Sequence, residues 1–320
     1  MSKELAIINL ISQLTGQPEA LADDAFWDAD NRLIYTTDML VENRHFNTHY
    51  FSPEALGWKA AAVNISDIAA MGGQLKYLLI SLGLPDSIGL DWIQEFYKGL
   101  LSACQRFGGH IAGGDTVSSD QITINVTAVG GCPPGHTVGR RYNAQAGDYV
   151  IATGFHGLSQ LGLMALQQNL PNLEACKAAH LHPMPKIESG LMLSAKYERY
   201  ALMDSSDGLA DALIKIAQAS GKTLRVNQDA IPVHPELAAY WQTANNPQAL
   251  WQGILYGGED FELVATVPEM DEALLAHFHV LGRVEEASQE PGAWLLEATS
   301  GKQQALSLSQ AYQHFQASHA

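Results

Sequence analysis

Acidic residues recur at the edges of apolar stretches in this sequence of 320 residues. Asp67 differs, because it stands within an apolar helical stretch and shares a helical face with Asn64, three residues earlier. Mg²⁺ and other hard cations bind oxygen ligands, commonly a few carboxylates together with substrate phosphates. The pattern therefore predicts a phosphate-binding site with several metal ions. The segments at the edges are Asp23-Asp24, Thr36-Thr37-Asp38, Gly113-Gly114-Asp115, Asp204-Ser205-Ser206-Asp207 and Gly257-Gly258-Glu259-Asp260.

Each of these segments also has a purely structural interpretation. An Asp that follows Gly is common in turns, and Asp or Ser between a strand and a helix often caps the helix. On this interpretation Asp204 or Ser206 caps a helix that begins near Gly208. Capping cannot explain a carboxylate in the middle of a helix, so a functional role is favoured for Asp67.

The net charge of the chain limits the partners that we expect. The formal charge is −16 at pH 7, and because nucleic acids and anionic membranes attract basic surfaces, we expect neither as a partner. Phosphorylated small molecules can still bind to such an acidic protein if metal cations neutralise the charge of their phosphates. Cys104, Cys132 and Cys176 are widely spaced, which argues against a disulfide framework or a zinc site. With no apolar stretch long enough for a membrane span and no secretory leader, we expect a cytoplasmic protein.

Hydrophobic periodicity predicts the elements that position the acids. Ser52 and Pro53 predict the start of a helix that continues to about Met71, and alternation from Ile122 to Ala128 predicts a strand. Strands and helices mix without strict alternation, which favours an α+β fold with mixed sheets flanked by helices. A change in composition near residues 132–135 predicts two domains, 1–137 and 138–320. Further strands are expected at 33–37, 75–84, 110–113, 149–153, 201–203, 224–227 and 261–267, and further helices at 91–107 and 209–219.

Several common signatures of nucleotide or metal binding are absent. Ser220-Gly221-Lys222-Thr223 ends like a P-loop, but Ile216 stands where the first glycine is required, so Gly221 is interpreted as a helix C-cap. Neither a protein-kinase DFG or HRD motif nor a GxGxxG at a helix start occurs. The segment 28–31 resembles part of an EF-hand loop and is interpreted as a hairpin turn.

Taken in order, the acidic segments resemble one known family. The sequence is similar to thiamine-monophosphate kinases, which belong with aminoimidazole ribonucleotide synthetase and selenophosphate synthetase in one superfamily. This resemblance implies a two-domain aminoimidazole ribonucleotide synthetase-like α+β fold, N-terminal domains that pair in a homodimer, and an active site in the cleft. The matching stretches are TTDMLVENRHF (36–46), GWKAAAVNISDIAAMGG (57–73), GGDT (113–116), MDSSDGLAD (203–211) and GGEDFEL (257–263).

Carried over position by position, the resemblance also implies the residues of the site. Magnesium ligands would be Asp24, Thr36, Thr37, Asp38, Asp67, Asp115, Asp204 and Asp207. ATP would be contacted by Tyr97, Gly114, Asp115, Arg141 and Ser206. Thiamine monophosphate would be contacted by His45, Glu259 and Tyr312.

The residue types alone leave other interpretations of these positions open. His45 could be structural beside its apolar run, Tyr312 could pack a helix near the C-terminus, and Arg141 could form a solvated pair with Arg140. The sequence also departs from the family where Ala22 replaces a usual glycine, at Asn43-Arg44, and at Thr36, where Ser is frequent. None of these departures removes a ligand atom.

The implied reaction moves the γ-phosphoryl group of ATP to a phosphate monoester, which is mostly dianionic at pH 7 and needs no general base. We therefore expect direct transfer without a phosphoenzyme, with Mg²⁺ and side chains positioning the phosphates. Two rivals remain. One is another ATP-dependent enzyme of the superfamily, an amidine cyclase or a selenophosphate synthetase, and the other is a non-catalytic protein that binds Mg²⁺ and nucleotide.

Overall fold

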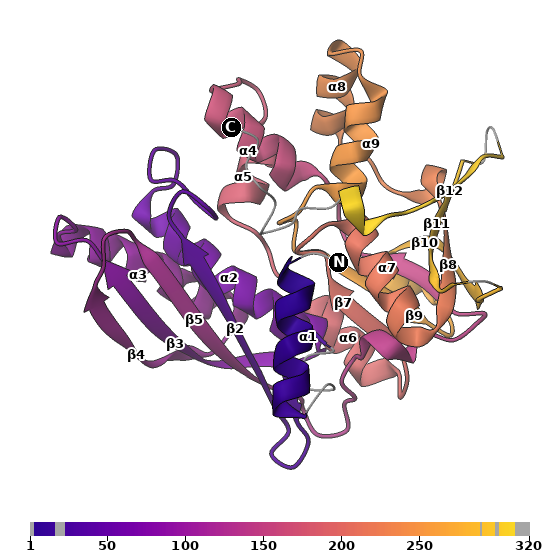
Figure 1. The fold of residues 1–320 in the computed structure, drawn as a ribbon, viewed down its shortest axis with the longest axis horizontal. Coiled ribbons are helices and arrows are strands. Elements are labelled where there is room, and N and C mark those ends of the chain that lie inside the picture. Colours follow the sequence, from indigo (N-terminus) through magenta and orange to yellow (C-terminus); the bar gives the residue numbers. More distant parts are fainter. Residues whose placement is uncertain (1–2, 17–22, 289, 298–300, 311–320) are drawn as a thin grey trace.

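Two β-sheets, one from each half of the chain, organise the molecule in the computed structural model, which describes residues 3–16, 23–288, 290–297 and 301–310. The first sheet has five strands in the order β1-β2-β5-β3-β4, and the second has seven in the order β12-β11-β8-β10-β6-β9-β7. Figure 1 shows the two sheets on opposite sides of the molecule, with helices α2 and α6 near the junction. The α+β fold that the sequence predicts is confirmed. In the part that the structure describes, no helix combines the length and apolarity needed to cross a membrane.

The N-terminal half pairs its sheet with two long helices on one face (Figure 1). Pairing in the sheet is antiparallel except between β3 and β4, which are parallel. The elements are α1 (Lys3–Thr15), β1 (Phe26–Asp28), β2 (Leu33–Val41), α2 (Pro53–Ala70), β3 (Gln74–Leu84), α3 (Leu90–Phe107), β4 (His110–Ser118) and β5 (Thr123–Gly131).

The C-terminal half builds the second sheet and the remaining helices. Its strands are β6 (Tyr149–Ala152), β7 (Ala201–Asp204), β8 (Lys222–Asn227), β9 (Leu263–Val267), β10 (His279–Glu286), β11 (Gly292–Leu296) and β12 (Gln303–Ala305). Its α-helices are α4 (Leu158–Gln168), α5 (Glu174–Leu181), α6 (Ile187–Lys196), α7 (Leu209–Ser220), α8 (Pro235–Thr243), α9 (Pro247–Tyr256) and α10 (Glu272–Leu275). Short 3-10 turns are η2 (Arg141–Asn143), η3 (Gln228–Ala230) and η4 (Leu308–Gln310).

Helix α2 is the central element, because it packs between the first sheet and the C-terminal half. It begins as predicted: the hydroxyl of Ser52 accepts a hydrogen bond from the Ala55 amide, and Pro53 opens the first turn. Gly57 and Gly99 allow α2 and α3 to approach closely, since a Cβ on either would lie 1.9 Å from a carbonyl oxygen of the other helix. This packing holds the polar residues of α2 at fixed positions between the two halves.

The sequence misplaces the ends of three strands. The sequence predicts that β4 ends at Gly113, but the strand continues to Ser118. Gly114 allows close pairing with β3, since a Cβ there would lie 1.8 Å from the Ile80 oxygen. β2 runs on to Val41 and β7 includes Asp204. The acids of these strands therefore lie within or at the last residue of a strand rather than in the turn after it.

Other local predictions are confirmed. Gly221 ends α7 with a positive φ of 65°, as a helix C-cap does. The hairpin between β1 and β2 is closed by Asp28, whose carboxylate accepts hydrogen bonds from the backbone and side chain of Asn31. The predicted domain boundary after residue 137 lies between β5 and β6, where the chain passes from one sheet to the other, and stays a prediction.

Candidate active site

Three carboxylates from distant parts of the chain meet where the two halves join. Asp24 precedes β1, Asp67 lies in the last turn of α2, and Asp204 ends β7. One carboxylate oxygen from each lies within 4.8 Å of the others. We call Asp24, Asp67 and Asp204 the acidic triad.

Neighbouring polar groups hold the acidic triad in place. The Thr36 hydroxyl of β2 donates to Asp67 at 2.5 Å, and the Ser66 hydroxyl of α2 donates to Asp204 at 2.6 Å. Asn64 accepts a hydrogen bond from the backbone amide of Asp38 at 2.9 Å. The polar face of α2 thus fixes both β2 and β7, and this explains why an otherwise apolar helix carries Asn64, Ser66 and Asp67.

The acidic triad concentrates negative charge in a buried place. The pKa of Asp67 is raised well above its ordinary value, first by burial and then by the charges of Asp38, Asp204 and Asp24. The pKa of Asp204 is raised by burial and by Asp24. The set consists of carboxylate oxygens with a hydroxyl beside them, and the repulsion between them is what a divalent cation would relieve. These donors therefore fit Mg²⁺.

Three further predicted metal ligands, Asp38, Thr37 and Asp207, take different positions. Asp38 lies on the face of β2 that packs on α2, close enough to raise the pKa of Asp67. The Thr37 side chain lies on the opposite face, where its hydroxyl bonds the Val126 oxygen. Asp207, in the loop before α7, has its carboxylate 3.3 Å from the Lys215 ammonium.

Three of the predicted ATP contacts, one of them also a predicted metal ligand, lie away from the acidic triad within one chain. Gly114 and Asp115 are exposed on β4, and β5 and β3 separate that strand from β2. At a strand spacing of 4.7 to 4.9 Å this separation is about 14 Å. Tyr97 is on α3, where its ring packs edge-to-face on Phe96 and burial raises its pKa. The structure does not bring these residues together with the acidic triad.

The other two predicted ATP contacts adjoin the acidic triad. Arg141 lies with its Nη2 2.6 Å from a carboxylate oxygen of Asp24, and only 17% of its side chain is exposed. Burial alone would lower the pKa of Arg141, but the carboxylates of Asp24, Asp204 and Asp23 together outweigh burial and raise that pKa. The solvated surface pair considered above for Arg140-Arg141 is therefore wrong. Ser206 lies beside Asp204, and its backbone oxygen accepts from the Glu259 amide at 2.7 Å.

The capping interpretation of the segment 204–207 is also wrong. The N-cap of α7 is Gly208, and no side chain caps that helix. Asp204 instead accepts from Ser66, on the other half of the chain. The carboxylate is therefore directed into the junction and not at the helix that follows it.

A cavity of about 1360 Å³ connects this region with the predicted acceptor residues. Asp38, Ser206 and Asp207 line one part of it, and His45 and Glu259 line another. His45 accepts a hydrogen bond from the Val41 amide at Nδ1, so its neutral form carries the proton on Nε2. Tyr312 lies outside the described residues.

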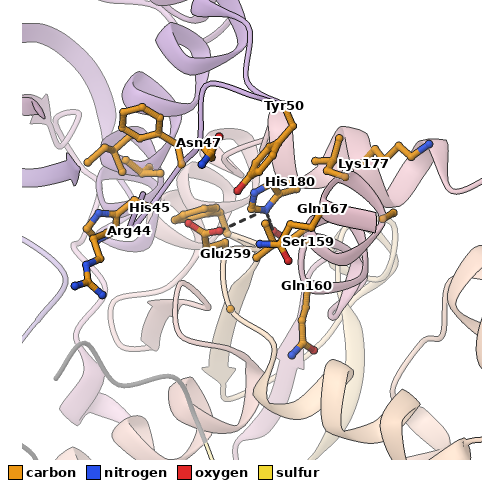
Figure 2. Close-up of a pocket in the computed structure, with 18 of the residues that line it drawn as sticks. Arg44, His45, Asn47, Tyr50, Ser159, Gln160, Gln167, Lys177, His180 and Glu259 are labelled. Atoms are coloured by element: carbon orange, nitrogen blue, oxygen red, sulfur yellow. Dashed lines mark hydrogen bonds and ion pairs between the residues drawn. The ribbon is translucent and has the colours of Figure 1, made fainter. Parts of the chain in front are cut away.

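Glu259 has two partners that the sequence did not identify, Lys59 and His180, and Figure 2 shows the second of them. Its Oε1 lies 3.0 Å from the ammonium of Lys59 on α2, and its Oε2 lies 3.4 Å from Nδ1 of His180 on α5. Ser159 Oγ also approaches that same Nδ1, at 3.0 Å. Glu259 and Ser159 therefore contact the same nitrogen of His180. In a serine-hydrolase triad the serine and the acid contact different nitrogens of the histidine, so this arrangement is not such a triad. Burial, followed by Lys59, lowers the pKa of His180 to about 3, so the ring is neutral at pH 7.

This chain is similar in sequence to a known family model and to several known proteins. A family model described as "AIR synthase related protein, N-terminal domain" matches residues 22–132. The thiamine-monophosphate kinase of Synechococcus elongatus is 36% identical over 301 residues, covering 90% of this chain and 88% of the relative. That of Bacillus subtilis is 37% identical over 244 residues, with 73% and 72% covered. This chain belongs to the thiamine-monophosphate kinase family.

Solved structures agree with this family. AaThiL complexed with AMPPCP and TMP has a TM-score of 0.83 at 32% identity, covering 93% of this chain and 94% of that chain. The thiamine monophosphate kinase from Aquifex aeolicus gives 0.82 at 33% identity, with 94% and 98% covered. HypE in the HypE–HypF complex, at 18% identity and a TM-score of 0.77, covering 94% of this chain and 98% of that chain, shares the fold. The family and fold that the sequence predicts are confirmed.

Proposed function

We propose that this member of the thiamine-monophosphate kinase family transfers the γ-phosphoryl group of ATP directly to thiamine monophosphate, giving thiamine diphosphate. One observation carries the proposal: the acidic triad lies where β7 meets α2, and the cavity that begins beside it at Asp38 and Asp207 extends to His45 and Glu259. The related structure that contains AMPPCP, an ATP analogue, and TMP supports the same pair of substrates.

The main barrier to this reaction is repulsion between two polyanions. Two unit charges about 4 Å apart repel by roughly 4 kcal/mol at an effective dielectric constant of 20, and several such pairs arise here. When bound, Mg²⁺ would neutralise phosphate charge and align the attacking and leaving oxygens. The acidic triad and Asp38 would hold the metal ions. Asp207 and the Thr36 hydroxyl would complete this side of the site, whereas the Thr37 hydroxyl lies on the opposite face of β2.

Two basic side chains would position the phosphates. Arg141, held by Asp24, would contact the phosphates of ATP through its remaining N–H groups, and Ser206 would contact them from the other side. His45 would donate a hydrogen bond from its Nε2–H to the acceptor phosphate. No group in this account removes a proton from the acceptor, because a phosphate dianion is already the nucleophile.

The proposed homodimer explains the position of Asp115. Its side chain lies on the outer face of the first sheet, the face opposite α2, where apolar residues are exposed: Met39 at 53%, Leu79 at 39% and Val117 at 56%. Covering these residues with a second copy would stabilise the dimer. In such a dimer Gly114 and Asp115 would act at the site of the partner, whereas the contact of Tyr97, which lies on α3 over the other face of the sheet, stays a prediction. A cytoplasmic location stays a prediction.

A single assay tests the proposal. The protein is incubated with MgATP and thiamine monophosphate, and the products are identified by mass spectrometry. We expect thiamine diphosphate and ADP in equal amounts. ADP and inorganic phosphate formed only with a ribonucleotide amidine would show a cyclase instead, and nucleotide binding without any acceptor-dependent ADP would show a non-catalytic protein.

A further inference from the structure

Lys59 is a buried lysine to which the proposed mechanism gives no role. It lies on α2 among alanines, and 0% of its side chain is exposed. Its ammonium lies 3.0 Å from Glu259 and 5.2 Å from the centre of the Phe51 ring. A buried ammonium is costly unless it is paired, so packing alone would favour an apolar residue here. The ion pair with Glu259 therefore accounts for a lysine at this buried position.

Glu259 itself is held in an unusual conformation. Its φ is 66° and that of Phe261 is 52°, values that residues other than glycine rarely adopt. The Glu259 amide bonds the Ser206 oxygen, which ties this loop to the segment that carries Asp204. The side chain keeps 33% of its surface exposed and lines the cavity. Lys59 therefore holds the strained loop in place and keeps the Glu259 carboxylate at the wall of the cavity.

We propose that Lys59 is a positioning residue for the acceptor: its ammonium fixes the Glu259 carboxylate at the cavity wall, where that carboxylate faces the cationic ring system of thiamine monophosphate. The inference rests on the proposed function and adds a determinant of substrate recognition to it. The acceptor carries a positive charge next to its phosphate, and a fixed carboxylate would favour such a molecule over a neutral phosphate ester.

The charges around Glu259 agree with this role. Burial would raise the pKa of Glu259, but opposing contributions outweigh burial and lower that pKa, and the ammonium of Lys59 is the largest of them. Because His180 is neutral at pH 7, Lys59 is the main charge that stabilises the carboxylate. Without Lys59, Glu259 would lose both its main ionic partner and the group that holds its position.

The test compares the steady-state kinetics of Lys59→Met with those of the wild-type chain. We expect the KM for thiamine monophosphate to rise at least about tenfold, on the scale of one charge-assisted contact, while kcat and the KM for ATP change less than about threefold. A lysine with a merely structural role would not produce this separation. Lys222→Met is the matched control, since it removes another lysine–glutamate pair, with Glu286, far from the cavity; it should leave all three constants unchanged.

A double-mutant cycle shows whether Lys59 acts through Glu259. In the Glu259→Gln background, the further change Lys59→Met should leave the KM for thiamine monophosphate unchanged, because the carboxylate to be positioned is already gone. This comparison also holds if Lys59→Met alone does not fold, since the double variant leaves no unpaired buried carboxylate. An additional rise in KM in that background, or a loss confined to kcat, would overturn the inference. A wild-type chain that makes no thiamine diphosphate would instead reject the proposed function.

Discussion

Asp67 tests the proposal at the scale of single residues. Asp67→Asn keeps the size of the side chain and can still accept the hydrogen bond from Thr36, so the fold should persist. We expect kcat to fall at least about a hundredfold, the scale of a lost electrostatic contribution to the transition state. Circular dichroism checks the fold. Activity near that of the wild-type chain in excess Mg²⁺ would remove Asp67 from the predicted metal ligands.

Asp260 gives a prediction about pH. Its carboxylate accepts from the amides of Gly157 and Ser159, and burial raises its pKa to about 7. A raised pKa means that the folded state binds this proton more tightly than the unfolded state does. The group therefore stabilises the fold at low pH, and this contribution is lost as pH rises through about 7.

The comparison with Asp260→Asn isolates that contribution. The free energy of unfolding of the wild-type chain minus that of the variant should fall by about 1.4 kcal/mol per pH unit between about pH 4 and pH 7, and then level off. Urea unfolding at several pH values measures it. A difference that does not change with pH would show that Asp260 keeps an ordinary pKa in the fold.

The residues of the site were predictable to different degrees. The acidic triad follows from short local motifs, because each acid stands in a distinctive segment. Lys59, His180 and Ser159 were missed, since a buried ion pair joins residues far apart in sequence and leaves no periodic signal. One clue was available: a lysine in the alanine-rich stretch of α2 needs a partner.

At the scale of elements, close contact between α2 and α3 is a condition for the site. Gly99→Ala would place a Cβ 1.9 Å from the Glu54 carbonyl oxygen, so the helices must separate. We expect a loss of about 3 kcal/mol in the free energy of unfolding, measured by urea titration. Gly89→Ala, at the N-cap of the same helix, has nothing within 4 Å of the new Cβ and should cost about 1 kcal/mol or less, because Ala is only a poorer N-cap than Gly. Equal losses in both variants would contradict this packing.

Element types were predicted better than element ends. The sequence identified α2, α3 and α7 almost to the residue. α3 buries one apolar face, which gives a periodic signal. α2 is buried on nearly all sides, and its start is identified by Ser52 and Pro53 instead. Glycines were misread in β4, where Gly114 allows close pairing with β3 rather than a turn. Successive side chains of a strand point to opposite faces, so Thr37 lies on the other face of β2 from Thr36 and Asp38. The two-residue period of a strand predicts this, but matching the motif position by position does not take it into account.

At the scale of the whole molecule, the proposed homodimer leads to a complementation experiment. If Asp115 acts in the site of the partner, Asp67→Asn and Asp115→Asn chains are both inactive alone. A dimer of one of each has one site with both defects and one intact site. Unfolded and refolded together in equal amounts, they should recover about a quarter of the wild-type activity. No recovery in a mixture that light scattering shows to be dimeric would place Asp115 outside the partner's site.

The central claim is that carboxylates from both halves of the chain bind phosphates only through magnesium. The most direct measurement is the dissociation constant of a non-hydrolysable ATP analogue, determined by calorimetry in excess Mg²⁺ and again in EDTA. A surface with a net charge of −16 should repel the free nucleotide, so binding should weaken at least about a hundredfold in EDTA. Equal affinity under both conditions would contradict the account.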